Sequence, residues 1–352
     1  MPDSGPLLAV NELTVHYRRG LRTPPLVAVD GVSFDLGRGE TVALVGESGS
    51  GKSSIGSAVL GLTRPAGGRI HFQGTDLTGL RPRARHAAVQ GALQAVYQDP
   101  YSSLNPARRL GRSLLEPVVA DRSLTGRQRV ERVDTLLRRV GLRPDMTDAY
   151  PAELSGGQLQ RVAIARALMS SPALVVCDEP VSALDVSLQG QVLNLLNELQ
   201  ADLGLSYLFI SHDLSVVRHM AARTIVLYQG RVMEAGPTAQ VCTTPAHPYT
   251  RALLAAAPSL GTRRRPAGTS AGSIDHPPVG AGCPFSTRCP DAIDICHTVT
   301  PEPRLVDTGV QAACHRASPR SEGEPTCPTE DAKRPADDPG AGTRQPRSPS
   351  AG

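Results

Sequence analysis

The glycine-rich segment at residues 46–54 constrains the fold of this 352-residue chain more than any other feature. It follows a short apolar run, residues 42–45, which is typical of a buried strand. Glycines let successive backbone N–H groups turn inward around an anion, because no side chains block its approach. The pattern predicts a strand, a phosphate-binding loop (P-loop) and then a helix. The loop residues are Gly46, Glu47, Ser48, Gly49, Ser50, Gly51, Lys52, Ser53 and Ser54.

Lys52 is one of only two lysines in the chain, the other being Lys333, whereas all remaining cationic side chains of the Lys and Arg type are arginines. A lysine among arginines indicates that a compact ammonium group is required at that position. We expect Lys52 to bridge the β- and γ-phosphates of ATP and the Ser53 hydroxyl to ligate Mg²⁺. A flexible loop of small residues is the alternative at this point, and the rest of the sequence decides against it.

A second apolar run, residues 173–177, is too short for a helix and fits a central parallel strand. Two carboxylates follow it, Asp178 and Glu179. A carboxylate at such a strand end can hold Mg²⁺, and the next one can polarise an attacking water. We predict that Asp178 serves the metal and Glu179 the water, although such a pair taken alone is more often a solvated strand end.

A five-residue motif between these two sites narrows the family. Its residues are Leu154, Ser155, Gly156, Gly157 and Gln158. Ser155 and Gln158 predict a capping box at the start of a helix, and such an open helix N-terminus attracts anions. The motif resembles the signature of the ATP-binding cassettes of ABC transporters. The resemblance implies that this helix start faces the γ-phosphate held by another subunit.

Further residues match motifs of the same family in the expected order. The resemblance implies that Tyr17 stacks on adenine, that Gln98 senses both the metal and the membrane partner, and that His212 reaches the γ-phosphate. Asp185 matches the D-loop. The expected catalytic residues are therefore Glu179, His212 and Gln98. The expected Mg²⁺ ligands are Ser53, Gln98 and Asp178.

The resemblance also implies the fold class, which is α/β. It implies a P-loop NTPase (RecA-like) cassette with an antiparallel β subdomain, a helical subdomain at about residues 99–172 and a small Cys-containing C-terminal extension. Within the helical insertion, apolar residues at helical spacing predict an amphipathic helix that ends at Gly141. These residues are Val130, Val133, Leu137 and Val140. Residues 224–228 and 231–234, joined by Gln229 and Gly230, predict a hairpin.

Composition sets the expected boundaries. We expect an ATP-binding cassette at residues 1–258, a linker at 259–282, a four-Cys extension at 283–316 and a disordered tail at 317–352, where large apolar residues are almost absent. No apolar run is long enough to cross a bilayer and no secretory start is present, which predicts that the chain stays in the cytoplasm. The resemblance implies a peripheral position on the cytoplasmic face of the membrane. The net charge of +4, carried by scattered arginines, argues against nucleic-acid binding.

A finer resemblance concerns the transported solute. Residues 97–106, residues 247–250 and the stretch at 283–315 resemble ATPase subunits of oligopeptide and dipeptide importers. This implies that Mg-ATP binding, cassette dimerisation and hydrolysis drive peptide import. The implied partners are a second ABC ATPase subunit, two integral membrane permease subunits and, indirectly, an extracytoplasmic solute-binding protein. Importers of nickel and other small solutes share the extension, and a soluble ABC ATPase outside transport is a further alternative.

Four of the seven cysteines lie in the C-terminal extension, which has few large apolar residues. They are Cys283, Cys289, Cys296 and Cys314. So short a segment is not expected to build a core of its own and needs another means of ordering. Disulfides are rare in a reducing cytoplasm, and the spacings match no common zinc or ferredoxin pattern. Spacing alone leaves a metal site and loosely packed cysteines open, and the family resemblance implies a 4Fe–4S cluster.

Overall fold

The buried strand predicted ahead of the P-loop lies near the middle of an eight-stranded sheet, in the order β11-β12-β10-β9-β3-β8-β7-β6. The computed structural model describes residues 5–20, 23–119, 121, 123–256 and 282–317, which belong to one compact unit. The strands of the large sheet are β3 (Thr41–Val45), β6 (Leu93–Val96), β7 (Leu174–Asp178), β8 (Ser206–Ser211), β9 (Arg223–Tyr228), β10 (Arg231–Pro237), β11 (Arg304–Asp307) and β12 (Val310–Ala312).

The five strands β9, β3, β8, β7 and β6 run parallel to one another. Their apolar side chains are buried on both faces, as the continuous apolar runs of the sequence predicted. Because parallel strands end at the same edge of a sheet, the loops after β3, β7 and β8 lie side by side there. The predicted hairpin is also present, since β9 and β10 pair antiparallel around Gln229 and Gly230.

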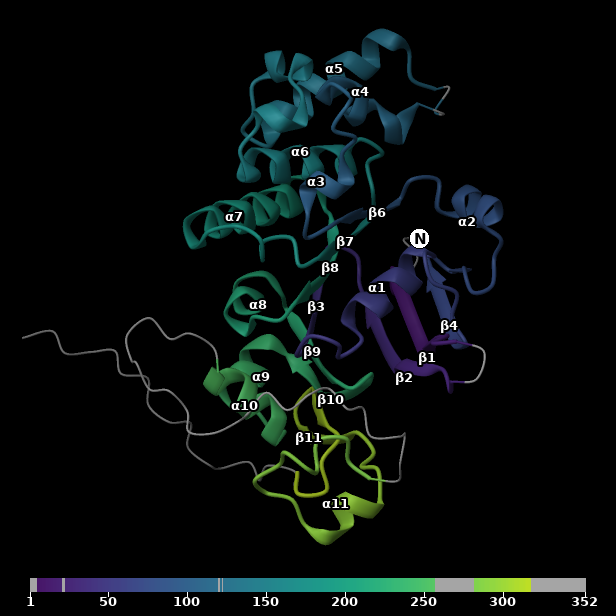
Figure 1. The fold of residues 1–352 in the computed structure, drawn as a ribbon, viewed down its shortest axis with the longest axis vertical. Coiled ribbons are helices and arrows are strands. Elements are labelled where there is room, and N and C mark those ends of the chain that lie inside the picture. The colour runs from purple at the N-terminus through teal and green to yellow at the C-terminus, as the bar shows by residue number, and fades with distance from the viewer. Residues whose placement is uncertain (1–4, 21–22, 120, 122, 257–281, 318–352) are drawn as a thin grey trace, which may run out of the picture. The chain divides into compact units, whose positions relative to one another are not determined.

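A second sheet, in the order β2-β1-β4-β5, is antiparallel throughout. Its strands are β1 (Leu8–Tyr17), β2 (Leu26–Leu36), β4 (Gly67–Phe72) and β5 (Thr75–Asp76). Helix α1 (Lys52–Leu60) follows the P-loop and lies between the two sheets (Figure 1). Its residues Ile55 and Val59 share one buried cluster with Val10 of β1 and Leu44 of β3. The start of α1 is therefore anchored to both sheets, which holds the loop before it.

A helical region lies between β6 and β7 in the chain and forms the upper part of Figure 1. It comprises α3 (Pro100–Ser103), α4 (Leu110–Leu115), η1 (Glu116–Val118), α5 (Gly126–Arg139), η2 (Pro144–Asp148), η3 (Pro151–Glu153) and α6 (Gly156–Leu168). The amphipathic helix predicted before Gly141 is α5, with Val133 and Leu137 buried. Val130 is 57% exposed, so the buried stripe is narrower than its spacing suggested. A short helix, α2 (Pro82–Val89), precedes β6.

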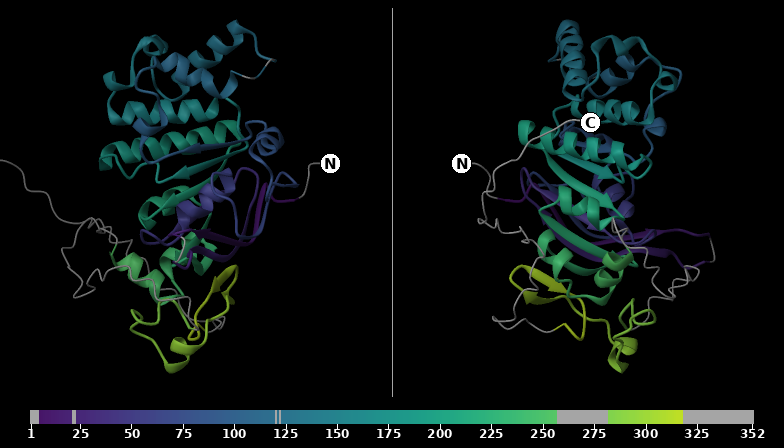
Figure 2. Two further views of the ribbon diagram at one scale, coloured as in Figure 1. Left: turned by 45° about the vertical axis from the view of Figure 1, so that its right-hand side comes forward. Right: turned by 90° about the vertical axis from the view of Figure 1, so that its left-hand side faces the viewer.

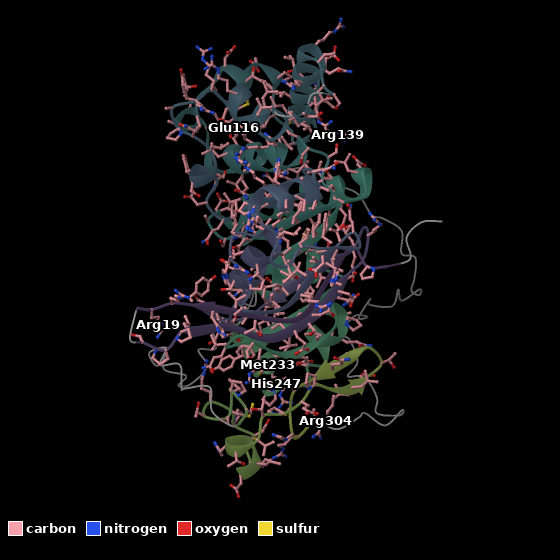
Figure 3. All side chains as sticks on the ribbon, turned by 90° about the vertical axis from the view of Figure 1, so that its right-hand side faces the viewer. Arg19, Glu116, Arg139, Met233, His247 and Arg304 are labelled. Atoms are coloured by element: carbon pink, nitrogen blue, oxygen red, sulfur yellow. The ribbon has the colours of Figure 1, made fainter. Side chains whose placement is uncertain are left out.

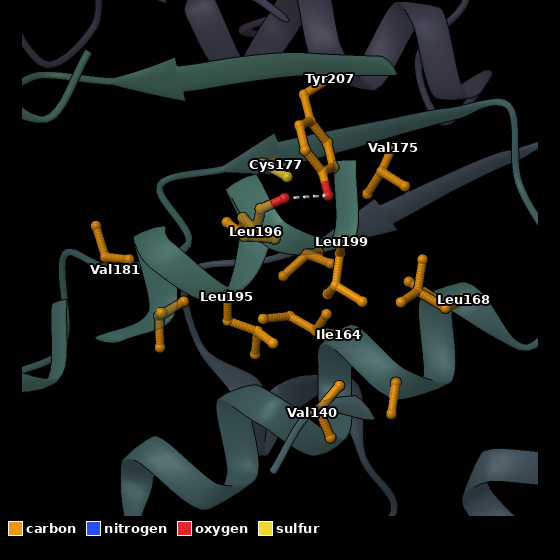
Figure 4. Close-up of a cluster of buried hydrophobic side chains, with 14 of the residues drawn as sticks. Val140, Ile164, Leu168, Val175, Cys177, Val181, Leu195, Leu196, Leu199 and Tyr207 are labelled. Atoms are coloured by element: carbon orange, nitrogen blue, oxygen red, sulfur yellow. Dashed lines mark hydrogen bonds between the residues drawn. The ribbon is translucent and has the colours of Figure 1, made fainter. Parts of the chain in front are cut away.

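Helices α6 and α7 (Val186–Leu203) cover the outer face of β7 and β8 with apolar side chains (Figure 4). Tyr207 of β8 is 1% exposed, and its hydroxyl donates a hydrogen bond of 3.0 Å to the carbonyl oxygen of Leu196. The ring can thus be buried without leaving its polar end unpaired. This core supports the strand end that carries Asp178.

The C-terminal extension is part of the large sheet. Strand β12 pairs antiparallel with β10, and β11 pairs with β12. The remaining helices are α8 (Leu214–Met220), α9 (Thr238–Thr243), α10 (Pro248–Ala256) and α11 (Asp294–Thr298). The extension lies at the end of the sheet opposite the helical region in the views of Figure 2, and Met233 and His247 lie where it meets the sheet (Figure 3). The expected linker and tail lie almost entirely outside the described residues, as does Lys333.

Among the described residues, no helix is both long enough and apolar enough to cross a bilayer.

Candidate nucleotide site

A pocket of about 230 Å³ opens above the P-loop at the carboxyl edge of the parallel strands. It is bounded by β1, β2, the P-loop, the start of α1 and the turn between β9 and β10. The lining residues are Tyr17, Leu26, Val27, Ala28, Ser48, Gly49, Gly51, Lys52, Ser53, Ser54, Glu179 and Gln229. The pocket combines an apolar end with a polar, glycine-rich end, as a nucleotide requires.

Two P-loop glycines are required by close approach of other backbone segments. A Cβ on Gly46 would meet the carbonyl oxygen of Leu227 at 2.2 Å, and a Cβ on Gly51 would meet that of Ala28 at 2.4 Å. Both residues also have φ in the range that L side chains rarely adopt, at 157° and 101°. The loop is further tied to the hairpin turn, because the N–H of Gly230 donates to the Ser50 carbonyl at 3.0 Å. The loop conformation is therefore held by its neighbours before any ligand binds.

Lys52 is 5% exposed, and its ammonium lies along the inside of the loop. Its Nζ donates to the carbonyl oxygens of Gly46 and Glu47, both at 2.8 Å, and to Ser50 Oγ at 3.3 Å. Burial lowers the pKa of Lys52, although the nearby carboxylates of Glu179 and Asp178 oppose that shift. A phosphate group would supply the missing counter-charge.

Ser53 and Asp178, the two residues expected to serve Mg²⁺, meet at the strand edge, where Ser53 Oγ donates to Asp178 Oδ1 at 2.9 Å. Burial is the main cause that raises the pKa of Asp178, and the hydrogen bond from Ser53 opposes it. A hydroxyl and a carboxylate side by side are oxygen ligands that suit Mg²⁺. The charge of a cation would also relieve the cost of holding this carboxylate ionised. The donor set therefore fits a magnesium ion.

Glu179 lines the pocket, and its carboxylate Oε2 lies 3.2 Å from Nδ1 of His212. The two residues follow the neighbouring strands β7 and β8. Glu179 has a positive φ of 48°, which is uncommon for a residue with a long side chain. Glu179 thus lines the pocket, whereas His212 lies outside the lining, next to Glu179, as Asp178 lies next to Ser53.

The other predicted site residues fall into two groups. Tyr17 lies in the pocket, where its hydroxyl donates to Ser54 Oγ at 3.3 Å. Gln98 is exposed just after β6 and is not among the residues that line the pocket, and neither is Asp185, whose side chain caps α7. The signature residues also lie outside the pocket, at the start of α6, with the predicted capping box between Ser155 and Gln158. Pocket and signature are thus separate surfaces of one chain.

Two parts of the pocket wall were missed by the sequence reasoning. Residues 26–28 of β2 and Gln229 of the hairpin turn both line the pocket. Gln229 has a positive φ of 47° in a turn that was recognised, but nothing local indicated that this turn faces the P-loop. Residues 26–28 carry only an ordinary strand pattern. Their position depends on how the two sheets pack.

Comparison with known proteins agrees with this geometry. Residues 29–182 match the family model described as ABC transporter, and residues 233–296 match one described as oligopeptide/dipeptide transporter, C-terminal region. The chain is 45% identical over 319 residues to the dipeptide transport ATP-binding protein DppF of Escherichia coli, covering 88% of this chain and 94% of that protein. It is 46% identical over 292 residues to the oligopeptide transport ATP-binding protein AppF of Bacillus subtilis, covering 82% and 89%.

The chain belongs to the ABC transporter ATP-binding proteins.

A solved structure extends the likeness to a nucleotide-bound cassette. The ATP-binding cassette MJ0796, in a dimeric post-hydrolysis state bound to ADP and Pi, matches 66% of this chain and 98% of its own chain with a TM-score of 0.60 and 27% identity. CbiO1 of Clostridium perfringens, part of the CbiONQ transporter complex, matches with a TM-score of 0.59 and 28% identity, covering 67% and 90%. This protein is therefore an ABC-type ATPase, and its nucleotide and metal are ATP and Mg²⁺.

The C-terminal extension of this ABC ATPase gathers its cysteines around one cavity. A cavity of about 10 Å³ is lined by all four cysteines of the extension and by two histidines. These residues are Cys283, Cys289, Cys296, Cys314, His247 and His315. That volume holds about one water molecule. Within the part of the chain that the structure describes, no group of three or more His, Cys, Asp or Glu side chains is arranged to hold a single metal ion. The thiols thus converge, but not as a compact ligand set for one ion.

Proposed function

We propose that this chain hydrolyses ATP at the P-loop pocket with the residues predicted from the sequence, and that hydrolysis drives import of peptides. The observation that carries the proposal is that Lys52, Ser53 and Glu179 line one pocket, with Asp178 bonded to Ser53 and His212 beside Glu179. These groups come from three different strand ends and serve one reaction only when they meet there.

Each group has a role that follows from its chemistry. The P-loop N–H groups and Lys52 bind the phosphates, and Tyr17 stacks on the adenine at the apolar end. Ser53 and Asp178, with Gln98 as a third ligand, would hold Mg²⁺, which would neutralise phosphate charge. Glu179 orients and polarises the attacking water. His212, oriented through Nδ1 by Glu179, presents Nε2 to the γ-phosphate.

The signature helix acts on a second subunit. In this proposal α6 points its N-terminus at the γ-phosphate bound by a partner cassette, with Leu154 and the four residues after it forming the trans surface. Its separation from the pocket in the same chain supports this arrangement. Asp185, at the start of α7, lies in the D-loop at the same interface. The partner is a second copy or a related ABC ATPase subunit.

The identities of the relatives support peptides as the cargo. We infer that the chain works at the cytoplasmic face of the membrane with two permease subunits, fed by an extracytoplasmic solute-binding protein, and that it binds no nucleic acid. Uptake distinguishes the cargo. Cells lacking the chromosomal gene and complemented with this chain should accumulate labelled dipeptides or oligopeptides, and cells complemented with Glu179→Gln should not. Uptake restored for Ni²⁺ but not for peptides would assign the chain to the alternative, a nickel importer.

Replacement of Glu179 by Gln tests the chemistry. The amide keeps the size of the side chain but removes the carboxylate that acts on water, so turnover should fall by roughly 10² to 10⁴ while ATP binding remains. Steady-state phosphate release and nucleotide titration measure the two quantities. Sedimentation with Mg-ATP should show the closed dimer accumulating in the variant. Turnover close to that of the wild type would remove Glu179 from this role.

We further propose that the four extension cysteines ligate one metal centre, a 4Fe–4S cluster. Their convergence on a common cavity supports it, and thiolates are the ligands of such clusters. A cluster is wider than one ion, so the arrangement around about 10 Å³ must open to admit it. His297 and His315, which directly follow two of the cysteines, are the candidate substitute ligands. Ligation would contribute to the folding energy of the extension.

Protein purified without oxygen tests this centre. It should be brown and contain iron and acid-labile sulfide, and replacing any one of the four cysteines by Ser should remove the colour. Cys242, a buried cysteine outside this cavity, offers the matched control, since Cys242→Ser should keep the colour. Stoichiometric zinc in colourless protein would change the metal assigned, and metal-free protein would leave the four cysteines as packing residues.

A further inference from the structure

An ion pair joins the P-loop to the C-terminal extension. Arg288 binds the carboxylate of Glu47 with both ends of its guanidinium, Nη1 to Oε2 and Nη2 to Oε1, each at 2.8 Å. The two residues are 241 positions apart in the chain. Glu47 is the second residue of the P-loop, and Arg288 lies between Phe285 and Cys289 in the extension. A residue of the extension thus touches the phosphate-binding loop directly.

Arg288 is held firmly on its own side of this pair. Its guanidinium carbon lies 5.7 Å from the ring centroids of both Tyr228 and Phe285, and Nη1 also donates to the Tyr228 hydroxyl at 3.3 Å. Its backbone N–H donates to the Phe285 carbonyl at 3.0 Å. Most surface ion pairs contribute little because two mobile side chains must be ordered. Here the guanidinium of Arg288 binds the carboxylate through two hydrogen bonds and packs on two aromatic rings. Little side-chain entropy is therefore lost when the ion pair forms.

Glu47 is fixed at its backbone as well. Its N–H donates to the hydroxyl of Tyr249 at 2.9 Å, and its carbonyl accepts from Lys52 Nζ at 2.8 Å. Tyr249 is completely buried, with its ring 4.7 Å from that of Tyr228 and 5.3 Å from that of Phe285. The side chain, the N–H and the carbonyl of Glu47 are therefore each engaged. Two of these contacts come from segments beyond β10, and the third comes from the phosphate-binding lysine.

We propose that Arg288 is a positioning residue of the nucleotide site, through which the C-terminal extension sets the affinity of the P-loop for ATP. Two physical effects act together. The ion pair between Arg288 and Glu47 keeps the P-loop ordered before ATP binds. Less conformational entropy is therefore lost when the phosphates of ATP bind. Arg288 also neutralises a carboxylate that would otherwise repel the phosphates. Both effects lower the dissociation constant of ATP, and neither acts on the attacking water.

The expected signature is a split between binding and turnover. Arg288→Ala should raise the Kd and KM for Mg-ATP by about 3- to 10-fold, while kcat stays within about 2-fold, because uniform binding is lost. Arg288→Lys keeps the charge but loses the bidentate guanidinium. Its Kd and KM for Mg-ATP should lie between those of the wild type and those of Arg288→Ala. In the double variant Glu47→Gln with Arg288→Ala no bare carboxylate remains. It should recover part of the affinity that Arg288→Ala loses.

Arg251→Ala provides the matched control. Arg251 on α10 forms an ion pair of 2.6 Å with Asp291 of the extension, so this variant also removes an arginine that ties the extension to the cassette. It makes no contact with the P-loop among the interactions that the described residues form, and its Kd for ATP should stay unchanged. Melting temperatures of all variants, measured in parallel, separate general destabilisation from a change in affinity.

Nucleotide titration with a fluorescent ATP analogue, together with steady-state kinetics of the full chain, decides the matter. Wild-type Kd and KM in Arg288→Ala would overturn the proposal, as would an equal loss in Arg251→Ala, which would show a purely structural effect. The proposal rests on the assignment of the P-loop pocket to ATP, and Lys52→Ala tests that assignment separately. If Lys52→Ala still bound ATP as the wild type does, the pocket assignment would fail, whatever Arg288 does.

Discussion

At the scale of single residues, the nucleotide site holds charges where burial opposes them. Burial lowers the pKa of Lys52 and raises that of Asp178, so each group is destabilised in its charged form. Asp178 follows four buried strand residues and is only partly reached by water. Such opposed charges are typical of sites that wait for a ligand to supply the missing partner. Keeping Lys52 and Asp178 charged therefore lowers the stability of the folded protein as long as phosphate and Mg²⁺ are not bound.

Asp178→Asn should therefore stabilise the protein without nucleotide while it abolishes ATP hydrolysis. The amide keeps the shape of the side chain and removes a charge that burial opposes, so the melting temperature at pH 7.5 should rise by roughly 1–4 °C. The raised pKa means that the folded wild type binds a proton more readily than the unfolded chain. Wild-type stability therefore gains relative to the variant as pH falls, and the difference should shrink as the pH approaches the raised pKa of Asp178.

Thermal unfolding from pH 5 to pH 8 measures this effect. Asp185→Asn is the control, because Asp185 is an exposed helix cap and Asn caps a helix equally well. Its melting temperature should follow that of the wild type across the range. A lower melting temperature for Asp178→Asn at pH 7.5 would contradict the account of the buried charge.

At the scale of elements, two helices begin with the same local device. Ser155 caps α6 and Thr125 caps α5, and each forms a capping box with the glutamine three residues later. Both helices pack on one apolar cluster. The two caps are therefore alike in structure, whereas only α6 is proposed to meet the nucleotide of a partner subunit.

Ser155→Ala and Thr125→Ala should lower stability by similar amounts, about 0.5–2 kcal/mol each, since each loses one cap. Only Ser155→Ala should lower ATP turnover, and it should leave ATP binding by the separate subunit intact because Ser155 does not line the pocket. Ser155→Arg should block dimer closure outright. Denaturation, phosphate release and sedimentation with Mg-ATP give the three quantities. Equal turnover in Ser155→Ala and Thr125→Ala would argue against a trans role for the signature.

At the scale of the whole molecule, the extension is built into the cassette. Strands β11 and β12 continue the large sheet, and Phe285 packs against Tyr228 and Tyr249 beneath the P-loop. The short segment thus orders itself by covering apolar residues of the cassette. The extension has few large apolar residues of its own, and this packing against the cassette orders it with or without a metal.

Phe285→Ala should expose this cluster and loosen the extension, at a cost of about 3–5 kcal/mol to the packing of a 2%-exposed ring. Hydrogen exchange should accelerate in residues 282–317, and ATP affinity should fall with it, because Arg288 loses one of its two rings. Ile295→Ala is the control, since Ile295 lies in the same extension and is 44% exposed. Unchanged exchange in Phe285→Ala would show that the extension is held by other contacts.

The sequence by itself determined the parts of the site that depend on local pattern. Two of these patterns mark strand ends: an apolar run followed by a glycine-rich loop, and an apolar run followed by two carboxylates. The third, a serine three residues before a glutamine, marks a helix start. These predictions placed Lys52, Asp178 and the α6 cap correctly in the fold, because strand ends of a parallel sheet share an edge. The linker and tail boundaries stay predictions.

Only the tertiary structure decided what meets the P-loop from outside. Residues 26–28 line the pocket because the two sheets pack together. Gln229 lines it because the turn between β9 and β10 lies next to the P-loop. The pair of Glu47 and Arg288 depends on the packing of Phe285, in the extension, against Tyr228 and Tyr249. Such contacts join residues far apart in the chain, and they leave no periodic or spacing signal in either segment. Their physical basis is the burial of apolar faces between elements, which brings together side chains whose local sequences are independent.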